Sequence, residues 1–339
     1  MRQNNIFLML LKVFFFSSIL VATSAVRAEL KVVTTIKPLH SLIANVMDGV
    51  GEPALIIEGS TSPHSFTLKP SHAKLLEEAD IIFWVGESIE TFMERPLESI
   101  VKNAEVVEFM EVESINKLKF REESIFEDHD DHDDHDDHDD HDDHDDHDDH
   151  DDHDDHDEHD DHSGHDHHGH AHGEFDAHIW LDPMNAKEMV HEIAHELGDL
   201  DPANKNKYEA NAQATIQALD QLVNDIEKGI NKDAKFVVFH DAYQYFEERF
   251  GVRAAGALTL NTDVLPGAKQ IADIQDVIKD RGIKCIFSEP QFNPKIITTI
   301  AEDMNIKTGV FDPLGANIDS NKDLYFKLIQ NLGNELKGC

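Results

Sequence analysis

Short apolar runs alternate with amphipathic stretches along most of the chain, a pattern that predicts an α/β fold. In the first half, the apolar runs of strand length are residues 30–36, 54–57, 81–85 and 105–109. Helical spacing of apolar residues lies between them, notably at residues 39–47 and 71–78. This order of strand, helix and strand predicts a mainly parallel sheet covered by helices.

The same alternation resumes after residue 172, behind two stretches with helical spacing. The stretches cover residues 185–197 and 202–230, and the longer one has Asp201 as its expected N-cap and Pro202 at its first helical position. The strands expected next are residues 236–239, 254–260, 285–287 and 308–311. The helices expected with them are residues 243–250, 267–280, 294–304 and 323–336.

These elements predict an α/β protein of two lobes, each a mainly parallel sheet flanked by helices, joined by one long rigid helix. The expected N-terminal lobe covers residues 29–200, the linking helix 201–231, and the C-terminal lobe 232–339. Ligands of such sheets bind beyond the carboxyl ends of the strands, so we expect a site between the lobes.

Residues 1–28 have the features of a secretory signal peptide. Arg2 and Lys12 flank an apolar stretch, and small residues precede Ala28, after which we expect cleavage. A retained membrane anchor is the competing interpretation. In an exported chain, two cysteines favour a disulfide, so we expect a bridge between Cys285 and Cys339; two unpaired thiols are the alternative.

Residues 128–172 form a repeat of Asp-Asp-His that interrupts the N-terminal lobe. The segment contains 24 of the 69 acidic side chains and no Lys or Arg, and it offers almost nothing apolar to bury. We therefore expect a disordered insertion. Outside it, 29 basic side chains stand against 45 acidic ones, a net charge of −16. That balance argues against nucleic acid or an anionic membrane as a partner.

Seven histidines lie outside the insertion, and three of them stand beside predicted strand ends or turns. His64 lies in a turn-rich loop after the second strand, His178 precedes an Ile-Trp-Leu-Asp-Pro segment, and His240 directly follows a strand. Each alone is typical of an ordinary loop residue. Three at such positions, in a chain with a His-Asp tract, indicate a metal site in the cleft.

Four segments of the chain resemble the signature segments of a known family. They are residues 63–71 (PHSFTLKPS), 177–183 (AHIWLDP), 238–243 (VFHDAY) and 311–315 (FDPLG). They are similar, in order and spacing, to those of the zinc-uptake substrate-binding proteins of ABC transporters, the ZnuA-like family. The resemblance covers almost the whole chain after residue 28 and implies two α/β lobes bridged by a long helix, with the metal between them.

The resemblance also implies the metal ligands. His64, His178 and His240 would be the imidazole ligands, and Asp312 the fourth. Manganese receptors of the wider family resemble this one but have a Glu at the third position, and three neutral imidazoles suit Zn²⁺ better than Mn²⁺. Close zinc relatives can have a Glu just before the first ligand, where this chain has Pro63. The fourth ligand is therefore Asp312 or a water, and Asp312 could instead cap the turn before Pro313.

From this resemblance we expect a monomeric periplasmic receptor that carries Zn²⁺ as its transported ligand and catalyses no reaction. Its partners would be a membrane permease and the cytoplasmic ATPase of an ABC transporter. The insertion would be a weak metal-binding loop that collects zinc, because imidazoles interleaved with carboxylates form many weak sites; a merely solvating acidic run is the alternative. Its histidines are His129, His132, His135, His138, His141, His144, His147, His150, His153, His156, His159, His162, His165, His167, His168, His170 and His172.

Two other classes of function remain to be separated from this one. Residues 191–195 read His-Glu-Ile-Ala-His, the HExxH pattern of zinc metallopeptidases. The same segment also reads as an amphipathic helix with its histidines in solvent, and no obvious third ligand follows it. A surface adhesin or metal buffer would bind zinc but would not be needed for uptake.

Overall fold

The computed structural model describes residues 29–126, 174–260, 262 and 266–339. The predicted signal peptide and the His/Asp segment 128–172 lie outside the described residues, so both stay predictions. Within the described ranges, no helix combines the length and the apolar character needed to cross a bilayer.

The N-terminal lobe contains a parallel sheet of four strands in the order β2-β1-β3-β4. The strands are β1 (Val32–Thr34), β2 (Ala54–Leu55), β3 (Ile81–Trp84) and β4 (Glu105–Glu108). The apolar β1 and β3 are fully buried in the centre, as expected for strands covered on both faces. The helices of this lobe are α1 (Lys37–Val46), α2 (Pro70–Glu78) and α3 (Glu94–Ser99), of which α3 was not predicted.

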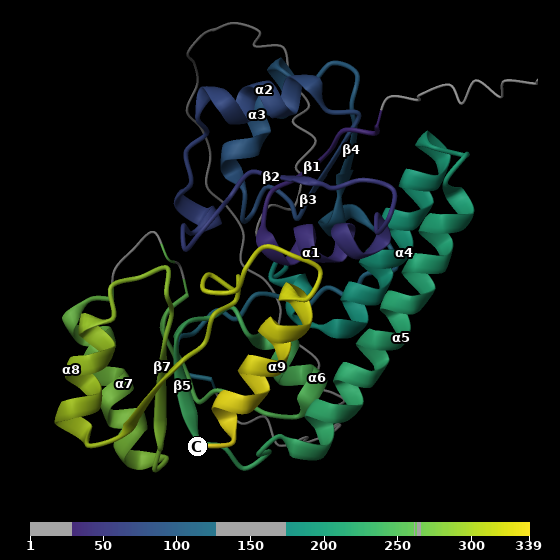
Figure 1. The fold of residues 1–339 in the computed structure, drawn as a ribbon. Helices are drawn as coiled ribbons and strands as arrows, with labels where there is room; N and C mark the ends of the chain where they lie inside the picture. The colour runs from purple at the N-terminus through teal and green to yellow at the C-terminus, as the bar shows by residue number, and fades with distance from the viewer. Residues whose placement is uncertain (1–28, 127–173, 261, 263–265) are drawn as a thin grey trace, which may run out of the picture.

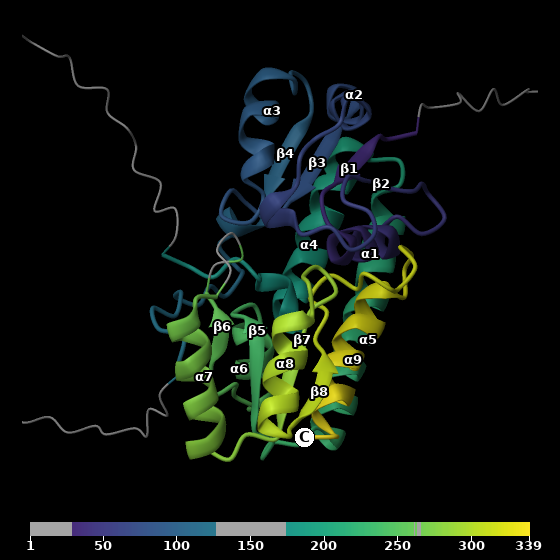
Figure 2. The same cartoon turned by 90° about the vertical axis from the view of Figure 1, so that its left-hand side faces the viewer.

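The C-terminal lobe repeats this plan with a parallel sheet in the order β6-β5-β7-β8. Its strands are β5 (Phe236–His240), β6 (Ala257–Thr259), β7 (Cys285–Ser288) and β8 (Lys307–Val310). Its helices are α6 (Gln244–Phe250), α7 (Ala268–Asp280), α8 (Lys295–Met304) and α9 (Leu324–Leu336). Figure 2 shows one lobe above the other. The predicted fold of two parallel-sheet α/β lobes flanked by helices is confirmed.

Two long helices, α4 (Pro183–Leu200) and α5 (Lys205–Gly229), pack against each other on one side of the molecule (Figure 1). α5 contacts α1 of the N-terminal lobe and α9 of the C-terminal lobe. At the α9 contact, a Cβ added to Gly333 would lie 3.1 Å from Ile226 Cγ2, so glycine permits the close approach of the two helices. A 25-residue helix in contact with both lobes fits the predicted link between them; the residue limits of the lobes stay predictions.

The predicted start of the long helix was wrong. α5 begins at Lys205 with Asn204 as its N-cap, and the preceding residues form a turn. The Asp201 carboxylate accepts hydrogen bonds from Asn204 Nδ2 (2.6 Å) and from the Tyr208 hydroxyl (3.3 Å). It therefore stabilises the turn between α4 and α5 through side-chain donors, whereas an N-cap would accept from the first backbone amides of the helix.

The predicted disulfide is confirmed: Cys285 and Cys339 are bonded, with their Cα atoms 5.7 Å apart. Cys285 begins the buried strand β7, and Cys339 follows the last helix, α9. The bridge therefore ties the end of the chain to the C-terminal sheet and closes a loop spanning 54 residues.

We predict that the double variant Cys285→Ser/Cys339→Ser is less stable than the unaltered protein by about 2–4 kcal/mol, because its unfolded chain is no longer constrained by the bridge. Urea unfolding followed by circular dichroism measures the difference. Dithiothreitol should lower the midpoint of the unaltered protein and leave that of the double variant unchanged. Equal midpoints for the two oxidised proteins would contradict the prediction.

Candidate metal centre

The structure brings together the three histidines that the sequence singles out. One ring nitrogen of each of His64, His178 and His240 lies within 4.8 Å of the other two. The ring centroids are 5.2 Å apart for His178 and His240, 5.6 Å for His64 and His178, and 5.9 Å for His64 and His240. Among the described residues, this is the one group of three or more His, Cys, Asp or Glu side chains placed to hold a metal ion.

His64 lies in a short 3₁₀ turn, η1 (Pro63–Ser65), in the loop that follows β2. Proline at the first position favours this turn because its fixed φ matches the helical value. The Ser62 hydroxyl accepts a hydrogen bond from the His64 backbone N–H (3.3 Å) and caps the turn. The sequence Ser-Pro-His therefore fixes the backbone that carries the first imidazole.

His178 immediately precedes the 3₁₀ turn η4 (Ile179–Leu181), which leads into α4. The Asp176 carboxylate accepts hydrogen bonds from the His178 backbone N–H (3.0 Å) and from its ring Nδ1 (2.7 Å). Downstream, Asp182 caps α4 by accepting from Met184 N (2.8 Å) and forms a bidentate ion pair with Arg249 of α6 (2.7 Å for each bond). Both ends of the segment that carries His178 are thus held by carboxylates.

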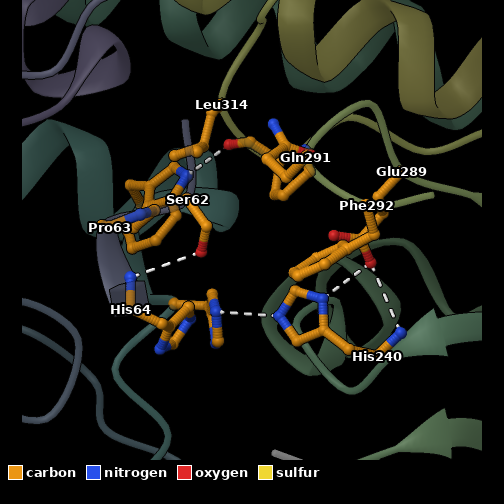
Figure 3. Close-up of a pocket in the computed structure, with 11 residues that line it drawn as sticks. Ser62, Pro63, His64, His240, Glu289, Gln291, Phe292 and Leu314 are labelled. Atoms are coloured by element: carbon orange, nitrogen blue, oxygen red, sulfur yellow. Dashed lines mark hydrogen bonds and ion pairs between the residues drawn. The ribbon is translucent and has the colours of Figure 1, made fainter. Parts of the chain in front are cut away.

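His240 is the last residue of β5, and Glu289 directly follows the neighbouring parallel strand β7. Adjacent parallel strands end side by side, so Glu289 Oε1 reaches His240 Nδ1 at 2.7 Å (Figure 3). When the carboxylate accepts from the ring, the proton of each paired imidazole lies on Nδ1 and Nε2 is turned toward the site. The Nε2 atoms of His178 and His240 are 3.3 Å apart.

Burial sets the protonation of this cluster. Burial, together with the neighbouring imidazoles, lowers the pKa of His64 and of His178 well below the ordinary value. Burial also opposes the charge on His240, but the carboxylates of Glu289, Asp241 and Asp176 together outweigh burial and raise the pKa of His240. Burial raises the pKa of Asp176 to about 7. Without a cation, His240 can therefore carry the proton shared between the two Nε2 atoms, which a metal ion would replace.

The space beside the three rings is small. Its volume is about 10 Å³, which is roughly what one water molecule needs and therefore suits a single ion. The apolar part of its wall consists of Pro63, Trp180, Phe292, Pro313 and Leu314. Imidazole nitrogens without a thiolate, in a largely apolar pocket, form a donor set suited to Zn²⁺.

Asp312, the predicted fourth ligand, lies two residues beyond β8 and outside the three-histidine group. Its Oδ1 accepts hydrogen bonds from Gln291 Nε2 (3.0 Å) and Leu314 N (3.2 Å), and its Oδ2 accepts from Ala316 N (2.6 Å). These are the contacts of the turn-capping alternative. The assignment of Asp312 as a ligand stays a prediction.

Sequence reasoning missed Asp176 and Glu289, the two carboxylates that orient the rings. Asp176 is two residues before His178, a spacing at which an Asp side chain bonds the local backbone, so a signal was present. Glu289 is 49 residues from His240 in the chain, and only the pairing of β5 with β7 brings them together.

The HExxH segment lies on α4 with its two histidines exposed. The apolar residues Met189, Val190, Ile193 and Leu197 are buried, as the amphipathic interpretation predicts, and His191 and His195 are on the outer face. The His195 ring contacts Glu196 and Asp199 of its own helix, and neither it nor His191 belongs to the metal-binding group found in the described part of the chain.

Comparison with known proteins identifies relatives that belong to one family. The family model described as zinc-uptake complex component A periplasmic (ZnuA) matches residues 32–339. The high-affinity zinc uptake system protein ZnuA of Brucella abortus (strain 2308) is 50% identical over 310 residues, covering 91% of each chain. Its namesake from Haemophilus influenzae (strain Rd) is 38% identical over 315 residues, covering 92% of this chain and 93% of the relative.

Solved structures share the fold. A crystal structure of ZnuA superposes with a TM-score of 0.67 at 20% identity, covering 90% of this chain and 98% of the other. The laminin-binding protein of Streptococcus agalactiae superposes with a TM-score of 0.66 at 23% identity, covering 91% and 99%. At such identities the likeness concerns the fold alone. The family match over almost all of the described chain, with relatives at 38% and 50% identity, shows that this protein belongs to the ZnuA family of periplasmic zinc-uptake components.

Proposed function

We propose that this protein is a periplasmic receptor that binds Zn²⁺ between its two lobes and delivers it to an ABC importer, without catalysing a reaction. The observation that carries the proposal is the convergence of His64, His178 and His240 on a pocket with room for one ion. Membership of the zinc-uptake family, and relatives named as high-affinity zinc uptake proteins, support it.

Zinc is the cargo in this proposal, and the residues of the chain bind and orient it. Asp176 and Glu289 hold the Nδ1 atoms of His178 and His240, which leaves the two Nε2 lone pairs for the ion. The two carboxylates also balance the double positive charge in a buried site. His64 follows a strand of one lobe and His240 ends a strand of the other, so separating the lobes would dismantle the ligand set and release the ion.

The partners in this proposal are a membrane permease and its cytoplasmic ATPase, and the receptor acts as a monomer. The family description as a component of a zinc-uptake complex supports a membrane partner. The chain would be exported and cleaved after Ala28, in keeping with the periplasmic place in the family description and with the leader-like composition of residues 1–28.

We also propose that the His/Asp segment 128–172 collects zinc close to the pocket. The residues that flank it are paired: Phe120 N donates to Glu174 O (3.0 Å), and Asp176 N donates to Leu118 O (2.8 Å). Asp176 in turn holds His178. The described chain resumes at residue 174, four residues before this predicted zinc ligand, which supports a role of the segment in supplying that site.

His64→Ala, His178→Ala and His240→Ala should each weaken zinc binding by roughly two orders of magnitude or more, because each removes one of three protein ligands. Competition calorimetry with a zinc chelator, on protein lacking residues 128–172, measures the loss. His191→Ala and His195→Ala, exposed on α4, are the matched controls and should bind as the parent does. A variant of the first three that binds as tightly as the parent removes that residue from the site.

Zinc affinity should fall as the pH is lowered. Zinc competes with the proton on His240, whose pKa is raised, so the loss should begin above about pH 6.5, the ordinary imidazole value. His64 and His178 have lowered pKa values, so their protons compete only at lower pH. Zinc dissociation constants measured from pH 8 to pH 5 test this order of competition by protons. An affinity at pH 5 equal to that at pH 8 would count against a site made of imidazoles.

Deleting residues 128–172 should reduce the number of zinc ions bound per chain and leave one tight site. The segment contributes 17 imidazoles that must be ordered anew for each ion, so its sites should be weaker than the preformed pocket. Titration calorimetry of the full and shortened proteins gives both stoichiometry and affinity. If the shortened but folded protein binds no zinc tightly, the tight site lies in the segment and the proposal for the pocket fails.

A further inference from the structure

Lys37 is a buried cation at the start of α1, with 5% of its surface exposed. Its ammonium group donates hydrogen bonds to three backbone carbonyls of the other lobe: Gly315 O (2.7 Å), Ala316 O (3.1 Å) and Ile318 O (2.6 Å). A lysine ammonium has three N–H donors, so all of them are used. Lys37 therefore joins the N-terminal lobe to one turn of the C-terminal lobe, residues 312–318, here called the roof turn.

The roof turn forms part of the wall of the metal pocket through Pro313 and Leu314. The Pro313 carbonyl accepts a hydrogen bond from Trp180 Nε1 (2.8 Å), and Trp180 is two residues from His178. Gly315 has φ +67°, a left-handed value that favours glycine and lets the chain reverse here. The side chains of Lys37 and Trp180 thus hold four backbone carbonyls of the roof turn in place.

Asp312 holds the same turn through its amide groups. Its carboxylate accepts from Leu314 N and Ala316 N, while the Ala316 carbonyl accepts from Lys37. The turn is therefore bound through its N–H groups by an anion and through its C=O groups by a cation. Releasing the Asp312 carboxylate toward a metal ion would break three hydrogen bonds at once, counting the one from Gln291.

We propose that Lys37 is a specificity-determining positioning residue: by fixing the roof turn, it keeps the Asp312 carboxylate off the metal and leaves an all-imidazole set of protein ligands. This inference rests on the proposed function and deepens it, because it assigns the fourth position to water. An additional carboxylate would make the site harder in the chemical sense and better suited to Mn²⁺. The Lys37 ammonium contacts none of the proposed metal ligands. It would therefore influence the preference for Zn²⁺ over Mn²⁺ indirectly, through the position of the roof turn.

The test compares Zn²⁺ and Mn²⁺ affinities of full-length Lys37→Met with those of the unaltered protein. Methionine keeps an unbranched apolar side chain and removes the ammonium. The ratio of Mn²⁺ to Zn²⁺ affinity should rise by at least about tenfold, because Asp312 becomes free to bind. The gain should be absent in Lys37→Met/Asp312→Asn. The His/Asp segment is common to all these proteins, so differences between them report the pocket.

Asn45→Ala is the matched control. Asn45 lies on the same helix α1 and donates to the Lys322 carbonyl (2.8 Å), so its removal also deletes a contact between the lobes but does not touch the roof turn. The ratio of Mn²⁺ to Zn²⁺ affinity of Asn45→Ala should equal that of the unaltered protein. A merely structural role of Lys37 would weaken the binding of both metals equally and leave the ratio unchanged.

An unchanged ratio in folded Lys37→Met overturns the inference, and so does a gain that persists without the Asp312 carboxylate. If Lys37→Met does not fold, a crystal structure of the unaltered zinc-loaded protein decides. Asp312 still on the roof turn supports the inference, and an Asp312 oxygen bound to zinc overturns it. Failure of the unaltered protein to bind zinc at its histidines would instead sink the proposed function.

Discussion

The proposed metal centre depends on two hydrogen bonds between carboxylates and imidazoles. Asp176 and Glu289 each hold the Nδ1 of one histidine at 2.7 Å, in surroundings where the carboxylates and the rings are buried. These bonds direct two Nε2 atoms toward one point, and His64 supplies a third ring. Without them, His178 and His240 could rotate or exchange tautomers, and a preformed site for a small cation would be lost.

The fold delivers these groups because parallel strands present their carboxyl ends at one edge of each sheet. His240 and Glu289 end neighbouring strands of the C-terminal sheet, and His64 follows a strand of the N-terminal sheet. Contacts between the lobes then set the separation of the two edges. α5 lies against helices of both lobes, and Lys37 binds the turn that covers the pocket. These contacts between the lobes bring three residues that are distant in the chain into a single candidate site.

Much of this arrangement could be predicted from sequence, because hydrophobic periodicity is a local property. It predicted the order of the strands and of most helices, though not α3, and the three histidines stood out beside strand ends and turns. The carboxylate partner of His240 could not be found in this way, because it depends on which strands pair. The roles of Lys37 and Asp312 depend on a turn folded between the lobes, and the start of α5 depends on how Asp201 bonds side chains within its own turn. Local patterns do not encode such contacts.

Anomalous diffraction at the zinc edge, from crystals of the zinc-loaded protein, tests the central claim most directly. The account predicts one strong peak between the lobes, about 2.0–2.1 Å from a ring nitrogen of each of His64, His178 and His240. Asp176 and Glu289 should keep their bonds to the two Nδ1 atoms. A strong peak elsewhere, such as beside His191 and His195, with the three rings left unbound, would contradict it.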